Sequence, residues 1–131
     1  MRRIALLLAV VALAACNNDS TSPNGNVSGT YSLRTVNGNT LPYTFSDGSV
    51  LISDQLTLNS NGTYTDIANF SNANSNPEQG YWSINNNLIT FNEQTLNGQT
   101  GANYTGSLSG SVLTETFSVN GGTITEVYQK D

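Results

Sequence analysis

The stretch Gly80-Tyr81-Trp82-Ser83-Ile84-Asn85-Asn86-Asn87-Leu88-Ile89-Thr90-Phe91 decides the fold, because it predicts a β-hairpin in one defined register. Two short runs with alternating apolar residues flank Asn86-Asn87, which has the length of a two-residue hairpin turn. The facing pairs are then Asn85 and Leu88, Ile84 and Ile89, and Trp82 and Phe91. Both apolar pairs fall on one face and Ser83 and Thr90 on the other, as in an antiparallel sheet with one face in solvent.

The chain from Val27 onward repeats this pattern. Runs of Thr, Tyr, Val, Ile, Leu and Phe alternate with Asn, Gly and Ser, and no segment has the apolar period of a helix. Asn-Gly, the strongest short hairpin signal, occurs at 37–38, 61–62, 97–98 and 120–121. The predicted strands are 28–37, 40–46, 49–58, 63–71, 79–85, 88–93, 102–108, 111–119 and 122–129. The predicted fold is all-β, a small antiparallel up-and-down barrel, with a sandwich as the alternative.

A second hairpin is predicted around Ser60-Asn61-Gly62. A three-residue loop, with Gly62 in the left-handed region, sets Leu58 opposite Tyr64. Leu56, Leu58 and Tyr64 then share the buried face.

The first sixteen residues, MRRIALLLAVVALAAC, have the features of an export signal. Two arginines precede the apolar run from Ile4 to Ala14, which is too short to span a bilayer as a helix. The run ends in Leu13-Ala14-Ala15-Cys16, which resembles the lipobox of bacterial lipoproteins. That resemblance implies cleavage before Cys16 and attachment of a diacylglyceryl group to its thiol. An ordinary secretory signal, cleaved nearby, is the alternative.

Three parts are expected along the chain: a lipoprotein signal peptide (1–15), the lipidated cysteine with a flexible linker (16–27), and the barrel domain (28–131). From Asn17 to Asn26 the linker has no apolar side chain except Pro23, so it cannot form a packed core. By resemblance to lipoprotein sorting in bacteria with two membranes, Asn17 after the cysteine implies the outer membrane. The protein is expected to be a lipid-anchored monomer of the bacterial cell envelope.

Composition excludes several classes of function. After removal of residues 1–15, two basic side chains remain against nine acidic ones, a net charge of −7, which makes nucleic acid a poor partner. Histidine is absent and the one cysteine is Cys16. The chain therefore lacks Cys–His and Ser–His nucleophile pairs, thiolate metal sites and internal disulfides. No catalytic residues, metal or cofactor are expected, and the chain is not expected to be an enzyme.

Several short motifs resemble the strands of bacterial lipocalin-like lipoprotein domains. They are Gly29-Thr30-Tyr31-Ser32-Leu33 followed by Asn37-Gly38 and Leu41-Pro42, Leu56-Thr57-Leu58 with Asn61-Gly62-Thr63-Tyr64, and Gly80-Tyr81-Trp82-Ser83-Ile84. The resemblance covers most of residues 29–129 and implies a small barrel that in some members encloses an apolar ligand. Lipocalins usually carry tryptophan where Tyr31 stands, with a basic residue of the last strand packed over it. Here Lys130 is the candidate for that basic residue.

Carboxylates are the only ionisable groups available for a site. Glu115 is in phase with Leu113 and Phe117, and Glu126 is in phase with Ile124 and Tyr128. If those apolar residues face inward, the two acids do too, and they could raise each other's pKa or hold a cation. If the phase changes at a bulge, or if the acids lie at the rim, they face solvent. Asp54 and Asp66 are ambiguous in the same way.

Aromatic residues at strand spacing could line a ligand pocket or fill a solid core. The candidates are Tyr31, Tyr64, Phe70, Trp82, Phe91, Phe117 and Tyr128. The predicted function is binding of a small, mainly apolar molecule inside a membrane-anchored barrel. The alternative is a non-enzymatic structural or interaction module of the envelope whose barrel core is solid. A cavity inside the barrel would distinguish the two.

Overall fold

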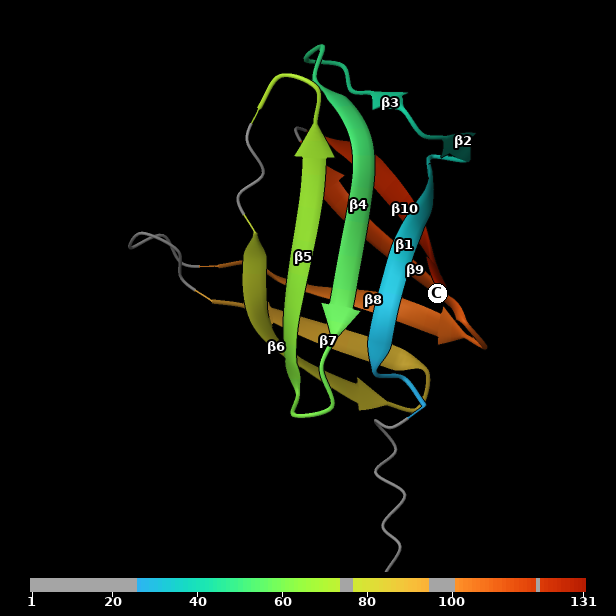
Figure 1. Cartoon of the computed structure of the whole chain (residues 1–131), viewed down its shortest axis with the longest axis vertical. Helices are drawn as coiled ribbons and strands as arrows, with labels where there is room; N and C mark the ends of the chain where they lie inside the picture. The colour runs from blue at the N-terminus through green and yellow to red at the C-terminus, as the bar shows by residue number, and fades with distance from the viewer. Residues whose placement is uncertain (1–25, 74–76, 95–100, 120) are drawn as a thin grey trace, which may run out of the picture.

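The computed structural model describes residues 26–73, 77–94, 101–119 and 121–131, which form strands and turns (Figure 1). Within these ranges there is no helix that could cross a membrane. The strands are β1 (Gly29–Val36), β2 (Asn39–Thr40), β3 (Tyr43–Thr44), β4 (Val50–Leu58), β5 (Thr63–Phe70), β6 (Glu78–Asn85), β7 (Leu88–Glu93), β8 (Asn103–Ser109), β9 (Val112–Val119) and β10 (Gly122–Lys130).

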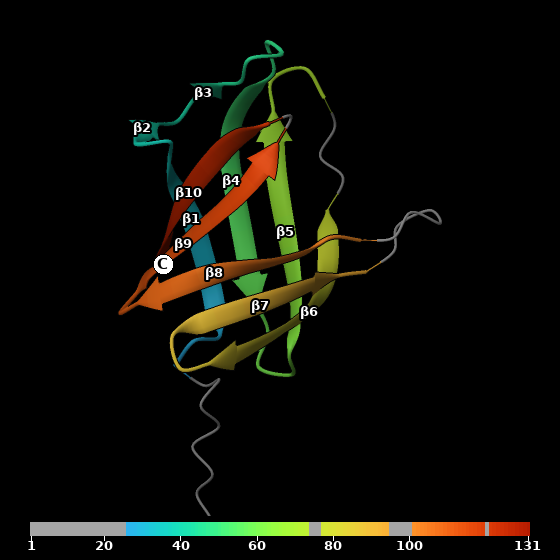
Figure 2. The ribbon, with the colours of Figure 1, turned by 180° about the vertical axis from the view of Figure 1, so that it is seen from behind.

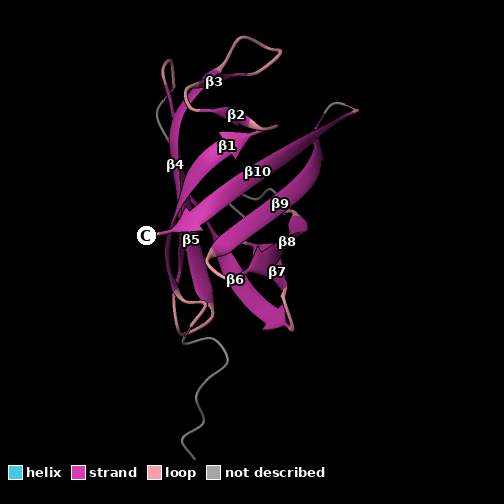
Figure 3. Ribbon diagram, turned by 90° about the vertical axis from the view of Figure 1, so that its right-hand side faces the viewer, coloured by secondary structure: helices cyan, strands magenta, loops and turns pink. Residues whose placement is uncertain are grey.

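β1 closes the sheet into a barrel, because it pairs with β10 along one edge and with β4 along the other. From β4 to β10 each strand pairs antiparallel with the next one in sequence, so eight strands form the ring. Figure 3 shows β1, β10 and β9 side by side across one face of the molecule. The predicted antiparallel up-and-down barrel is confirmed.

Both predicted hairpins have the predicted register. In β6 and β7, Trp82 faces Phe91, Ile84 faces Ile89 and Asn85 faces Leu88. The turn between these strands places Asn86 at a φ of 55°, in the left-handed region. In the β4–β5 hairpin Leu58 faces Tyr64, and Gly62 has a φ of 84°. The Asn-Gly pair at 97–98, Asn120, and residues 1–25 with Cys16 lie outside the described residues.

The continuous strand predicted at 40–46 is wrong. Two strands of two residues each form instead, and they lie outside the ring: β2 pairs with β1, and β3 pairs with β4. Pro42 lies between them, and proline has no N–H to donate to a ladder. A turn follows directly, in which the Phe45 N–H donates to the Ser49 carbonyl over 2.8 Å. This excursion places Phe45 against the core, with its ring 6.3 Å from that of Phe70.

One end of the barrel, where β1 begins and β4 ends, is closed by hydrogen-bonded aromatic side chains. The Tyr31 hydroxyl donates to the Val27 carbonyl over 2.6 Å, and the Trp82 indole donates to the Asn59 carbonyl over 3.0 Å. The Lys130 ammonium lies 5.9 Å from the centre of the Tyr31 ring, in the position expected from the lipocalin resemblance. The buried apolar core comprises Val27, Tyr31, Leu33, Val36, Leu51, Leu56, Leu58, Tyr64, Trp82, Ile89, Phe91, Leu113 and Tyr128.

Truncation of the β6–β7 pair should destabilise the barrel. Trp82→Ala or Phe91→Ala removes a buried aromatic ring and leaves a void, so each should cost about 3–5 kcal/mol of unfolding free energy. Ser83 lies on the exposed outer face, so Ser83→Ala should lower the free energy of unfolding by well under about 1 kcal/mol. Thermal or denaturant unfolding measures all three. A near-neutral Trp82→Ala would contradict this packing.

Candidate ligand-binding site

The barrel contains a cavity of about 840 Å³ toward the end where β4 begins. It lies where two ladders stop: β5 pairs with β6 only from Thr63 to Asp66, and the β8–β9 ladder ends at Gly106 and Glu115. Past that last pair β8 and β9 diverge (Figure 2). Volumes of 300–1,000 Å³ are typical of small-molecule sites.

The cavity reaches the surface between the diverging strands. Exposed residues of both strands belong to its wall, Asn103 and Thr105 on β8, and Thr116 and Ser118 on β9. Threonine, serine and asparagine make this entrance polar but uncharged.

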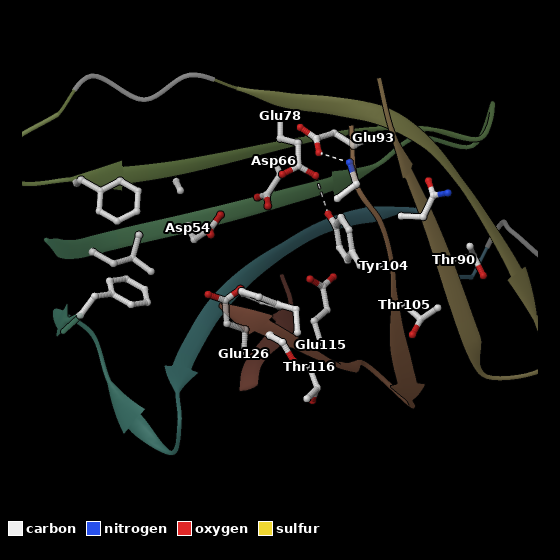
Figure 4. Close-up of a pocket in the computed structure, with 18 residues that line it drawn as sticks. Asp54, Asp66, Glu78, Thr90, Glu93, Tyr104, Thr105, Glu115, Thr116 and Glu126 are labelled. Carbon is white, nitrogen blue, oxygen red and sulfur yellow. Dashed lines mark hydrogen bonds between the residues drawn. The ribbon is translucent and has the colours of Figure 1, made fainter. Parts of the chain in front are cut away.

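The wall combines an apolar part with a large acidic part (Figure 4). Apolar side chains come from Phe45, Leu51, Ala68, Phe70, Ala102 and Phe117. Six of the nine acidic residues of the chain line the same space, namely Asp54, Asp66, Glu78, Glu93, Glu115 and Glu126. Each comes from a different strand, so the carboxylates form a belt around the inside of the barrel.

A β-bulge places Asp54 in this belt. The β4–β5 register shifts between Leu51 and Ser53, so Leu51 and Asp54 both face inward although they are three residues apart. Beyond the bulge, Asp54 is in phase with Leu56, which is also buried. The bulge thus resolves the ambiguity that the sequence left for Asp54, and Asp66 also points into the cavity (Figure 4).

Glu115 and Glu126 face each other directly across the β9–β10 ladder. They are 3% and 7% exposed, and both line the cavity, which is the inward arrangement considered from the sequence. The Tyr128 hydroxyl lies 3.1 Å from Glu126 Oε2 and 3.2 Å from Asp54 Oδ2. Its single hydrogen serves one of these oxygens at a time, so the other needs a proton or a different donor.

Two tyrosines hold Glu78 in place. The Tyr64 hydroxyl donates to Glu78 Oε1 over 2.6 Å, and the Tyr104 hydroxyl donates to the same oxygen over 2.8 Å. A Cβ at Gly80 would overlap the Asn92 carbonyl oxygen and lie 2.7 Å from Cε1 of the Tyr64 ring, so glycine leaves room for both. Glu93 has a backbone partner instead, since Glu93 Oε2 accepts the Ala102 N–H over 2.8 Å.

Burial is the main cause of strongly raised pKa values in the carboxylate belt. Burial, followed by contact with Asp54, raises the pKa of Asp66 to about 9. Burial raises the pKa of Glu126 to about 7, although its hydrogen bond with Tyr128 acts the other way. The pKa values of Asp54 and Glu115 are also raised, first by burial and then by neighbouring carboxylates. Part of the belt is therefore protonated at neutral pH.

No basic side chain of the described ranges lines the cavity. Arg34 lies on the outside, 3.6 Å from Asp131, and Lys130 lies over Tyr31. The described residues also include no group of three or more acidic side chains arranged to hold a metal ion. Among the described residues, tyrosine side chains donate hydrogen bonds to the belt, namely those of Tyr64, Tyr104 and Tyr128.

The structure separates the seven predicted lining aromatics into two groups. Phe70 and Phe117 line the cavity. The other five do not, because they are packed in the core between the cavity and the closed end. The prediction that they line a ligand pocket is corrected for Tyr31, Tyr64, Trp82, Phe91 and Tyr128. Tyr128 nevertheless contacts the site through its hydroxyl.

Sequence reasoning missed Glu78, Glu93 and Tyr104, although strand alternation contains the signal for all three. Glu78 is two residues from Gly80 and four from Trp82, which are buried. Glu93 is likewise in phase with Phe91, and Tyr104 with the buried Gly106. Each lies at the end of its strand, where the apolar pattern no longer indicates which face is inside.

No family model matches this chain, and no curated protein matches it. Several solved structures are similar to it. Fatty-acid-binding protein 1 of Echinococcus granulosus has a TM-score of 0.47 and 12% sequence identity, and the match covers 80% of this chain and 97% of that one. The REP1-NXSQ fatty acid transporter has a TM-score of 0.43 and 6% identity, covering 80% of this chain and 96% of the other.

The belt should make the barrel less stable as the pH rises. The pKa of Glu126 rises from 4.5 to about 7 on folding, and that of Asp66 from 3.8 to about 9. The folded state therefore binds more protons than the unfolded chain between these values, and stability is lost through that window as pH increases. The melting temperature should be roughly 5 °C or more lower at pH 8 than at pH 5.

Two variants test the origin of this effect. Glu126→Gln should flatten the pH dependence, because it removes one of the titrating groups from the interior. Asp131→Asn removes a charge from the exposed surface and should leave the dependence unchanged. A melting temperature that increases between pH 5 and pH 8 would contradict the raised pKa values.

Proposed function

We propose that this protein binds a small, mainly apolar molecule inside its barrel. The observation that carries the proposal is the cavity of about 840 Å³, whose wall is apolar in part and which reaches the surface between β8 and β9. Binding without chemistry fits the lack of histidine and of any cysteine except Cys16. The protein would then act as a carrier, store or sensor of its ligand.

The cavity favours this function over an interaction module with a solid core. Barrels of eight strands can be filled by their own side chains, and the closed end of this one is. At the other end, Ala68, Phe70 and Phe117 line the cavity and do not fill it. A cavity of this size would only lower the free energy of unfolding of a purely structural module, because unfilled space in a protein core is destabilising.

We also propose that the barrel is tethered to the outer membrane by lipid on Cys16. Support comes from the apolar run Ile4 to Ala14, the lipobox-like Leu13-Ala14-Ala15-Cys16, and the polar linker before the barrel. A tether of this kind would keep the binding site near the membrane surface, where apolar molecules are concentrated.

Filling the cavity should abolish ligand binding. Octanol should bind the wild type saturably in calorimetric titration, and Ala68→Trp should remove this binding because the indole occupies the cavity. Ile67→Trp is the matched control, since Ile67 is adjacent in sequence but 37% exposed on the outer face, and it should bind as the wild type does. Failure of octanol and longer apolar alcohols to bind the wild type would refute the proposed function.

Lipidation can be measured directly on membrane fractions of the native host. Mass spectrometry should find a mature chain that begins at an acylated Cys16. Cys16→Ser should release the protein from the membrane, because no other thiol is available for the anchor. A mature chain that begins elsewhere, or a Cys16→Ser variant that stays in the membrane, would disprove the anchor.

A further inference from the structure

We propose that the ligand is an amphiphilic amine, whose protonated nitrogen binds at Glu115 and the carboxylates facing it, while its apolar part contacts Phe45, Leu51 and Phe70. This inference rests on the proposed function, and it specifies the chemical class of the ligand. It predicts a preference that an apolar cavity alone would not have.

The first argument is the balance of charge inside the barrel. Six carboxylates from six strands line one cavity, and no basic side chain of the described part of the chain does. Figure 4 shows Asp54, Asp66 and Glu78 on one side of this space and Glu115 and Glu126 on the other. Those carboxylates of the belt that are ionised would repel an anionic ligand such as a carboxylate and attract a cation.

The second, independent argument is an unsatisfied acceptor. Glu115 is 3% exposed and lines the cavity, yet its Oε1 has no hydrogen-bond partner. Buried polar atoms without partners destabilise a protein and are rare in native structures. A ligand that brings an N–H donor would satisfy Glu115 Oε1.

The geometry favours an organic cation over a metal ion. Metal sites need several ligands converging on one point, and no such group occurs among the described acidic residues. The carboxylates are instead spread around a wall that also carries Phe45 and Phe70. A molecule with one ammonium group and one apolar group matches both parts. Binding would replace protons held on the buried carboxyls by the ligand cation.

Three ligands that share one apolar chain test the inference on the whole purified protein: octylammonium, octanol and octanoate. Calorimetric titration at pH 8 should give octylammonium a dissociation constant about tenfold or more lower than that of octanol, the gain expected from a buried charge-assisted hydrogen bond. Octanoate should bind more weakly than octanol.

Glu115→Gln should abolish the preference for octylammonium, measured as the ratio of the octanol and octylammonium dissociation constants of the same variant. Asp66→Asn provides a second neutral variant from another strand with the same expectation, in case Glu115→Gln does not fold. The surface variant Asp131→Asn changes net charge equally and should keep the full preference.

Each other outcome is decisive. If the three ligands bind alike, or if octanoate binds best, the amine inference is overturned while the proposed function stands. If Glu115→Gln and Asp66→Asn both fold and keep the preference, or if Asp131→Asn loses it, the carboxylate belt is not the recognition site. If no ligand binds, the proposed function fails and the inference fails with it.

Discussion

The pairing of β1 with strands on both of its edges is the constraint on which the rest of the structure depends. With β4 on one side and β10 on the other, the sheet has no free edge along β1 and must enclose an interior. In a closed sheet every second side chain of each strand points into that interior. The interior is therefore shaped by alternation on eight strands, and its chemistry is set by whichever residues occupy the inward positions.

Those inward positions divide the barrel into two halves of different character. Near the start of β1 they carry Tyr31, Trp82 and other large apolar residues, which fill the space and supply most of the apolar burial. Toward the other end they carry carboxylates, which cannot pack without partners. The tyrosine hydroxyls of residues 64, 104 and 128 lie between the two halves and hydrogen-bond the carboxylates nearest to them. Most of the apolar burial therefore lies in one half, and the proposed ligand site in the other.

The sequence was informative about pairing and less informative about the site. Residues 80–91 predicted the correct register, because a turn of fixed length links the phase of one strand to that of the next. For Glu115 and Glu126, strand alternation left both an inward and a solvent-facing arrangement open, and the structure shows the inward one. Alternation also could not settle Asp54, whose phase depends on a bulge, and a bulge depends on the neighbouring strand. Nor could the sequence reveal the cavity. Phe117 lines the cavity and Phe91 is packed in the core, and this difference depends on where the β5–β6 and β8–β9 ladders stop.

The end of the β8–β9 ladder at Gly106 and Glu115 has a consequence for how the entrance can change in evolution. Past this pair, each of the two strands turns one edge of its main chain toward the gap, and the described residues supply no partner strand for those edges. Peptide N–H and C=O groups thus border the opening together with the side chains of Asn103, Thr105, Thr116 and Ser118. Peptide groups persist whatever side chain a position acquires. Substitutions at the rim can therefore alter the width of the entrance more readily than they can remove its polarity, and related barrels could diverge in ligand size while keeping a hydrated entrance.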